Sequence, residues 1–238
     1  MYGWRGRIGF VLPSRGDSFI YEFYQVVPKG VVFVPAIIGL FHLVKEELSA
    51  AILKYRAAAR ELAQVGVDAL VLSGSPLFQL QGYGSDLKMI EEVEKETGIP
   101  TLTSVTAEVE AMRFLKMKKL VIATPFTEEV NERNAAWYRQ AGFEVLKIKG
   151  LGIEKNSEIA RQPSYASYQL AREVFLAAPG ADGIYIACPR WGTIEIIEKL
   201  EQDLGVPVTS SSQATFWMAL RKARVHEPIQ GYGKLLKA

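Results

Sequence analysis

The stretch Gly183-Ile184-Tyr185-Ile186-Ala187-Cys188-Pro189-Arg190-Trp191-Gly192 has the form of a buried strand followed by a loop. A short apolar run that ends at Pro and Gly is typical of a strand covered on both faces. Helical patterns at Tyr165–Ala178 and Thr193–Leu204 lie on either side of it. A strand between two helices indicates an α/β protein with a parallel sheet.

A second stretch of this kind lies earlier in the chain, where the strand Ala69–Leu72 leads into the loop Ser73-Gly74-Ser75-Pro76. Further strands are predicted at Ile8–Leu12, Val31–Val34, Pro100–Leu102, Lys119–Ala123, Glu144–Ile148 and Val206–Thr209. Further helices are predicted at Glu46–Val65, Leu87–Thr97, Ser104–Lys116, from Thr127 to near Gly142, and at Gln213–Lys222. This strict alternation implies parallel sheets with helices on both faces.

The two series of elements indicate an internal duplication. The strand ending at Pro13 corresponds to the strand before Pro125, and the loop at Gly74 corresponds to the loop at Cys188. The separations are similar, 61 positions (13 to 74) and 63 positions (125 to 188). We therefore expect two pseudo-symmetric Rossmann-like (flavodoxin-like) subdomains. The first is predicted to comprise residues 1–116 plus 213–238, and the second residues 117–212.

Composition excludes several classes of protein. The 28 Lys and Arg residues nearly balance the 26 Asp and Glu residues, which argues against a nucleic-acid-binding face. One cysteine among 238 residues excludes an intrachain disulfide and a cysteine-based zinc site. His42 and His226 make a poor metal site without a carboxylate cluster. No complete dinucleotide loop or Walker motif is present, so neither a metal nor a cofactor is expected.

No segment of the sequence indicates a membrane or a secretory route. Residues 1–7 lead straight into a strand without a signal-peptide pattern. The longest apolar stretch, Val31 to Val44, is shorter than the roughly 20 residues that span a bilayer. We expect a cytoplasmic protein with no membrane partner. The sequence leaves open whether the chain forms a homo-oligomer.

Candidate site residues lie where the predicted strands end. Ligands of open parallel sheets bind beyond the carboxyl ends of the strands. Five loops fit that rule: Pro13-Ser14-Arg15, Gly74-Ser75-Pro76, Thr124-Pro125-Phe126-Thr127, Cys188-Pro189-Arg190, and Thr209-Ser210-Ser211-Ser212. If the two halves face each other, these loops line one cleft, and we expect the active site there.

Cys188 is the candidate catalytic residue. A thiol just before a helix that begins near Thr193 is expected to have a lowered pKa, because helix N-termini favour the thiolate. Such a group could donate or accept a proton at carbon near neutral pH. The alternative is a buried, inert cysteine, which is common in proteins.

Hydroxyl and guanidinium groups in the other loops suit a carboxylate. Ser75, Thr124 and Ser211, with nearby backbone N–H groups, could hold a carboxylate or an enediolate. Arg190 and Arg15 could bind a carboxylate through two hydrogen bonds. Turn formation, helix capping and solvated surface positions are the alternative roles.

Several stretches in this order resemble one protein family. They are Arg7–Pro13, Gly74–Leu77, Ile122–Phe126 leading to Val130–Arg133, Cys188 with its strand, Pro207–Ala214, and Gly231–Leu235. Together they resemble the aspartate/glutamate/hydantoin racemase superfamily, in its maleate isomerase and arylmalonate decarboxylase branch. The resemblance covers nearly the whole chain.

The resemblance implies a cofactor-free enzyme with its active site between two α/β subdomains. Racemases and maleate isomerases of this kind carry two cysteines, whereas this chain has Gly74 at the first position, as arylmalonate decarboxylases do. There, a malonate loses carbon dioxide to give an enediolate, and the remaining cysteine, here Cys188, protonates it. The resemblance places the small carboxylic acid substrate against Pro13, Ser14, Gly74, Ser75, Pro76, Thr124, Phe126, Pro189, Arg190 and Ser211.

Three departures put the arylmalonate substrate itself in doubt. Pro76 and Pro189 lack the backbone N–H, and Phe126 lacks the hydroxyl, that the family pattern supplies. Each lost oxyanion donor is worth about 3–4 kcal/mol. Two other functions therefore stay open: a maleate-isomerase-like or racemase-like enzyme with a single cysteine, and a catalytically inactive carboxylate-binding protein.

Overall fold

A computed structural model describes residues 2–14, 16–40 and 48–238. The chain divides into two compact units. The first unit comprises Met1–Gly16, Val27–Ala107 and Thr215–Glu227. The second unit comprises Asp17–Val26, Glu108–Ala214 and Pro228–Ala238. The division expected from the sequence, 1–116 with 213–238 and 117–212, stays a prediction.

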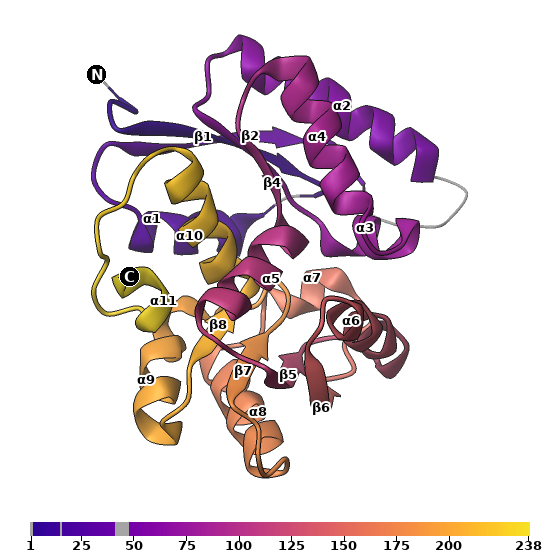
Figure 1. The fold of residues 1–238 in the computed structure, drawn as a ribbon, viewed down its shortest axis with the longest axis vertical. Helices are drawn as coiled ribbons and strands as arrows, with labels where there is room; N and C mark the ends of the chain where they lie inside the picture. Colours follow the sequence, from indigo (N-terminus) through magenta and orange to yellow (C-terminus); the bar gives the residue numbers. More distant parts are fainter. Residues whose placement is uncertain (1, 15, 41–47) are drawn as a thin grey trace. The chain divides into compact units, whose positions relative to one another are not determined.

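Among the described residues, each unit contains one four-stranded sheet in which all neighbouring strands are parallel (Figure 1). The first sheet has the order β2-β1-β3-β4, from β1 (Gly6–Leu12), β2 (Val31–Ile37), β3 (Ala69–Leu72) and β4 (Thr101–Thr103). The second has the order β6-β5-β7-β8, from β5 (Lys119–Thr124), β6 (Glu144–Gly150), β7 (Gly183–Ile186) and β8 (Val208–Ser210).

The two sheets repeat one topology, the flavodoxin-like order in which the second strand lies outside the first. Individual hydrogen bonds repeat as well. The amide of Ser73 donates to the carbonyl of Val11 at 3.0 Å, and the amide of Ala187 donates to that of Ala123 at 2.9 Å. The predicted parallel α/β fold and its internal pseudo-symmetry are confirmed.

The described helices lie between these strands along the chain, except α10 and α11, which follow the last strand (Figure 1). They are α1 (Asp17–Val26), α2 (Leu48–Gln64), α3 (Ser75–Gln81), α4 (Ser85–Thr97), α5 (Ser104–Phe114), α6 (Glu128–Gln140), α7 (Asn156–Ile159), α8 (Ser164–Leu176), α9 (Ile194–Leu204), α10 (Ser211–Lys222) and α11 (Lys234–Lys237). In the first unit α2 packs on β1, β2 and β3, and in the second α8 packs on β5, β6 and β7.

Four of these helices are not predicted from the sequence: α1, α3, and the short α7 and α11. Helix α1 buries Phe19, Phe23 and Val26, whose spacing is that of one helical face. Helix α3 carries Pro76 in its first turn, where a missing N–H breaks no helical bond. The helix expected at 46–65 is observed as Leu48–Gln64, and residues 46 and 47 lie outside the described part.

The strands supply the core of each unit. Every residue of β3 and β7 is buried, as expected for parallel strands covered on both faces. Phe10 on β1 stacks on Phe33 of β2, with ring centroids 3.9 Å apart. At the end of β6, Gly150 lies so close to the loop after β5 that a Cβ there would overlap the carbonyl oxygen of Phe126. This contact places the end of β6 directly against the loop after β5.

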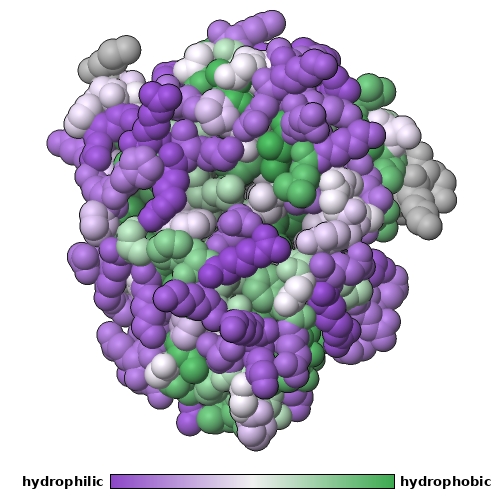
Figure 2. All heavy atoms as spheres, in the orientation of Figure 1, coloured by the Kyte–Doolittle hydropathy of each residue, from purple (hydrophilic) through white to green (hydrophobic). Residues whose placement is uncertain are grey.

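The face seen in Figure 2 is largely hydrophilic, with hydrophobic side chains gathered in small groups between the polar ones. Exposed apolar residues include Trp4, Tyr21 and Leu53. Within the described ranges, no helix has both the length and the apolar character that crossing a membrane requires.

Candidate active site

The loops that follow β3 and β7 occupy equivalent places in the two units. In each sheet the second strand lies on one side of the first strand, and the third strand lies on its other side. Flavodoxin-like folds bind ligands at this switch point, where the strand order reverses. The loop after β3 contains Gly74, and the loop after β7 contains Cys188. The topology therefore places the predicted catalytic residue at a ligand-binding end of its own sheet.

Gly74 and Cys188 share a backbone conformation and a hydrogen bond. Both have a positive φ, 114° for Gly74 and 82° for Cys188. The amide of Gly74 donates to the hydroxyl of Ser104 at 3.2 Å, and the amide of Cys188 donates to that of Ser211 at 3.0 Å. Ser104 and Ser211 are the first residues of α5 and α10, the helices that follow the fourth strand of each sheet. Each unit thus ties its switch-point loop to the next helix in the same way.

The conformation of Cys188 is strained. A positive φ is rare for a residue with a Cβ and costs on the order of 1–3 kcal/mol. The hydrogen bond to Ser211 offsets part of that cost, and so does the bond from the amide of Trp191 to the carbonyl of Cys188, at 3.2 Å. The Trp191 side chain is fully buried, which anchors the loop. Strain held in this way is characteristic of functional sites.

The thiol of Cys188 is protonated at neutral pH. Its side chain is 7% exposed, and burial raises its pKa to about 12, against the opposing effects of the backbone N–H of Arg190, the Arg190 charge and the backbone N–H of Trp191. The sequence-based expectation of a lowered pKa is wrong. Because the proton stays on sulfur, this group can act as an acid.

The N-terminus of α9, from which the lowered pKa is expected, is bonded to another group. The amides of Thr193 and Ile194 donate to one carboxylate oxygen of Glu22 on α1, at 2.5 and 2.9 Å. The positive end of the helix therefore faces a buried carboxylate instead of the sulfur. Burial raises the pKa of Glu22, and these two amide bonds act in the opposite direction.

Ser211 is held inside the protein. Its side chain is buried, and its oxygen lies 2.7 Å from the hydroxyl of Tyr185 as well as 3.0 Å from the amide of Cys188. The expected contact of Ser211 with a substrate stays a prediction, while these bonds show what the hydroxyl does in the folded chain.

The loop after β5 is organised by Thr124. Its hydroxyl donates to the amide oxygen of Asn131 at 2.6 Å and accepts the backbone N–H of Phe126 at 3.1 Å. Phe126 is half-buried, as are Pro189 and Arg190 in the cysteine loop. The carbonyl of Arg190 accepts the hydroxyl of Ser18, at 3.1 Å, so α1 also holds this loop. These residues surround the switch point of the second unit.

The first unit assembles its own candidate residues around Gly74. A Cβ at Gly74 would touch the ring of Pro13 at 3.4 Å, and the hydroxyl of Ser75 lies 3.3 Å from that of Ser104. Ser14 is half-buried, and Pro76 is exposed. Arg15 and His42, both weighed above as ligand-binding candidates, lie outside the described residues.

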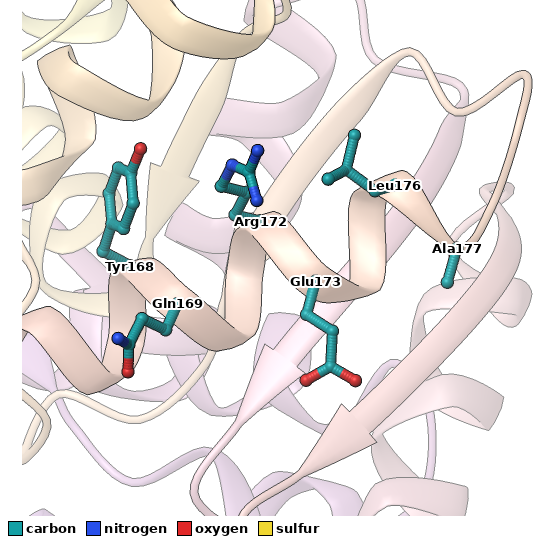
Figure 3. A pocket seen from close by; sticks show the side chains of 6 residues that line it. All are labelled: Tyr168, Gln169, Arg172, Glu173, Leu176 and Ala177. Atoms are coloured by element: carbon teal, nitrogen blue, oxygen red, sulfur yellow. The ribbon is translucent and has the colours of Figure 1, made fainter.

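A surface hollow of about 710 Å³ lies elsewhere, on the outer side of α8 (Figure 3). In this view Tyr168, Arg172 and Leu176 point to one side of the helix, and Glu173 points to the other. No predicted site residue lines it. This hollow is therefore separate from the candidate active site.

Four residues with a part in the site are missed from the sequence: Glu22, Tyr55, Ser104 and Tyr185. Ser104 could have been found, because it holds in the first series the position that Ser211 holds in the second. Tyr55 donates its hydroxyl to the carbonyl of Ser73, beside Gly74. No sequence signal marks Glu22 or Tyr55, since each acts across a long separation in the chain.

The fold and these loops define an α/β protein of two flavodoxin-like units with a buried thiol at a strand end. The family model for arylmalonate decarboxylase matches residues 8–236. The arylmalonate decarboxylase of Bordetella bronchiseptica is 30% identical over 96% of this chain and 95% of its own. The chain belongs to the arylmalonate decarboxylase family.

Two further comparisons extend this result. A maleate isomerase of Pseudomonas putida is 25% identical, covering 97% of this chain and 96% of its own. The structure of an unliganded arylmalonate decarboxylase superposes with a TM-score of 0.86 at 29% identity, over 97% of this chain and 98% of that one. These relatives are enzymes, and the resemblance stated from the sequence is confirmed.

Proposed function

We propose that this protein is a cofactor-independent enzyme that decarboxylates a malonate-type acid through an enediolate, which Cys188 protonates. The observation that carries the proposal is the thiol itself. It is buried, and its pKa of about 12 keeps it protonated at neutral pH. A group that must deliver a proton to carbon needs that protonated form.

The reaction balances with one thiol. The bond between the α-carbon and one carboxylate breaks, carbon dioxide leaves, and the electron pair stays on the enediolate. The α-carbon then takes the proton of Cys188, and the resulting thiolate regains a proton from water. The backbone N–H groups of Arg190 and Trp191, which lower the pKa of the thiol, would stabilise that transient thiolate.

For the substrate we propose a small dicarboxylic acid. The proposed contacts are Pro13, Ser14, Gly74, Ser75, Pro76, Thr124, Phe126, Pro189, Arg190 and Ser211. Arg190 would bind the carboxylate that is retained, through two hydrogen bonds. This role replaces the oxyanion donors that Pro76, Phe126 and Pro189 lack, and it favours an acid other than an arylmalonate.

A maleate-isomerase-like activity is the second candidate, supported by the 25% identity to the Pseudomonas putida enzyme. Addition of sulfur to a double bond requires a thiolate. The raised pKa of Cys188 disfavours that form, so decarboxylation ranks first. A racemase-like reaction would need a second proton donor, and a carboxylate-binding protein without turnover is the remaining alternative.

The test is a turnover screen of wild type against Cys188→Ser with phenylmalonate, alkylmalonates, maleate and amino-acid hydantoins, followed by NMR in deuterated water. We expect carbon dioxide release and one α-deuteron from a malonate, and loss of most activity in the serine variant. A cis-to-trans shift would select the isomerase, and α-deuterium exchange alone would select the racemase. Binding without turnover in both forms would select the carboxylate-binding protein.

For location, we propose the cytoplasm, because a catalytic thiol must stay reduced and reducing compartments maintain that state. For assembly, we propose that any homo-oligomer forms without a disulfide, since Cys188 is the sole cysteine and is buried.

A further inference from the structure

A line of buried polar side chains runs behind Cys188. The hydroxyl of Tyr138 donates to a carboxylate oxygen of Glu108 at 2.7 Å. The hydroxyl of Tyr185 lies 2.7 Å from that of Ser211, which accepts the amide of Cys188 at 3.0 Å. We call the four side chains behind the cysteine the support network: Glu108, Tyr138, Tyr185 and Ser211.

The support network joins four elements, and its four residues all belong to the second unit. Glu108 lies on α5, Tyr138 on α6 and Tyr185 on β7, and Ser211 begins α10. Glu108, Tyr138, Tyr185 and Ser211 are each at most 2% exposed. The two tyrosine rings meet edge to face, with centroids 5.1 Å apart. Burial, and next the charge of Glu108, raise the pKa of Tyr185, whose hydroxyl also interacts with Tyr138.

The carboxylate gives the line a direction. The hydroxyl of Tyr138 donates to Glu108, so the line of hydrogen bonds runs toward this carboxyl group. The hydroxyl of Ser211 then donates to Tyr185 and keeps its lone pairs for the amide of Cys188. Hydrogen bonds aligned in one direction strengthen one another in a buried setting. The peptide plane of Cys188 is thereby held at its positive φ.

The first unit supplies an internal comparison. The amides of Leu70 and Ile184 make equivalent bonds, to the carbonyls of Pro100 and Pro207, so Val71 is the counterpart of Tyr185. The unit with a glycine at its switch point thus has an apolar residue where the unit with the thiol has a buried tyrosine. Both units possess the amide–serine bond that holds the loop. The buried tyrosine at this strand position occurs in the unit that carries the thiol.

We propose that the support network positions Cys188 for proton delivery and couples its thiol to the carboxylate of Glu108. The proposal rests on the proposed function for the meaning of proton delivery. The coupling of the Cys188 thiol to Glu108 concerns the ionisation of the thiol, so it can be tested without a substrate. Glu108, Tyr138 and Tyr185 are positioning residues, since they act on the substrate through Cys188, and Ser211 has this role in addition to its proposed contact with the substrate.

The kinetic test uses Tyr185→Phe, which removes one hydroxyl and keeps the ring packing. We expect kcat to fall roughly 10- to 100-fold with KM little changed, because a misplaced reacting group loses rate rather than ground-state binding. The kcat of Ser211→Ala should fall similarly, and Ser211→Thr, which keeps a hydroxyl, should recover most of the rate. A change confined to KM, or no recovery with threonine, would overturn the positioning role.

The second test needs no turnover. Alkylation of the single cysteine by iodoacetamide at one pH near neutrality, followed by mass spectrometry, gives a rate that scales with the thiolate fraction in the folded protein. The charged groups that act on Cys188 are Arg190 and Glu108. Because the Glu108 charge opposes thiolate formation, Glu108→Gln should be labelled faster than wild type.

The matched control is Glu201→Gln. Glu201 is also a buried carboxylate of the second unit, and it accepts the amides of Val208 and Lys234 instead of a tyrosine. Its replacement should leave the labelling rate of Cys188 unchanged. Faster labelling of Glu108→Gln alone supports the network even if no acid in the screen turns over. Equal labelling rates for Glu108→Gln and wild type overturn it even in an active enzyme.

Discussion

The hydroxyl of Tyr55 occupies the space where a side chain on Gly74 would begin. A Cβ built on Gly74 would lie 2.6 Å from the tyrosine oxygen, which donates to the carbonyl of Ser73. Gly74 also has φ 114° and ψ 72°, a conformation that disfavours every residue with a Cβ. Two separate constraints therefore keep position 74 a glycine. They also maintain the difference between the two switch-point loops, of which one has Gly74 and the other has Cys188.

Gly74→Ala should lower the free energy of unfolding by about 2–4 kcal/mol, from backbone strain and from the contact with Tyr55. Gly98→Ala is the control, because Gly98 has a positive φ of 70° but nothing near its Cβ position. Urea denaturation measures both. In the Tyr55→Phe background, Gly74→Ala should cost less than in wild type, since the obstructing oxygen is gone. Equal costs at positions 74 and 98 would contradict the steric part of this account.

Gly150→Ala should be severely destabilising. The Cβ of the alanine would overlap the backbone carbonyl oxygen of Phe126 and lie 2.7 Å from the side-chain nitrogen Nδ2 of Asn131. Because the Phe126 oxygen belongs to the backbone and cannot rotate away, we expect a loss of about 3 kcal/mol or more in the free energy of unfolding. Gly6→Ala is the matched strand control, because its Cβ would meet only ordinary contacts at 3.6 Å. Similar urea midpoints for the two variants would show that the loop after β5 yields easily.

Glu22 should make the protein less stable as pH rises. Burial raises its folded-state pKa above the ordinary 4.5, so between these two values the folded state binds more protons than the unfolded state. The stabilising contribution is complete below the unfolded pKa and is lost as pH rises through the folded one. Compared with wild type, Glu22→Gln should therefore gain stability as pH rises from 4.5 through the folded-state pKa. Glu132 is exposed, so Glu132→Gln is the control. Parallel curves of unfolding free energy against pH for Glu22→Gln and wild type would refute the prediction.

The thiol of Cys188 should react slowly in the folded protein. With burial raising its pKa to about 12, the thiolate fraction near neutral pH is at least about a hundredfold below that of an ordinary cysteine, whose pKa is about 8.5. Iodoacetamide labelling measured by mass spectrometry should be slower by at least that factor than labelling of the urea-unfolded chain at the same pH. Comparable rates in the two conditions would mean that the thiol is exposed or activated.

Much of the fold could be predicted because the strands are short apolar runs that end at Gly or Pro, as at Leu72–Gly74 and Ala187–Pro189. Helix α1 could have been found as well, since Asp17 precedes an apolar face formed by Phe19, Phe23 and Val26. Helix α3 is hidden because Gly74-Ser75-Pro76 has the composition of a loop, although proline is also common in a first helical turn.

The candidate site is less predictable, because long-range contacts decide its chemistry. Nearness to the start of α9 indicates a low pKa for Cys188, but Glu22, 166 positions away (188 minus 22), accepts the helix amides. Ser211 is recognisable from the sequence as a hydroxyl at a strand end. Its partner Tyr185 has the pattern of an ordinary core residue of the strand, because nothing local shows which way a hydroxyl turns.

The two units exchange segments along the chain. Asp17–Val26 belongs to the second unit although the first unit surrounds it in sequence, and Thr215–Glu227 belongs to the first although it follows most of the second. A cut after Ala107 would therefore leave each fragment with a segment of the other fragment's unit. We expect such a nicked protein to stay together under native conditions, and neither fragment to give a complete unit when expressed alone.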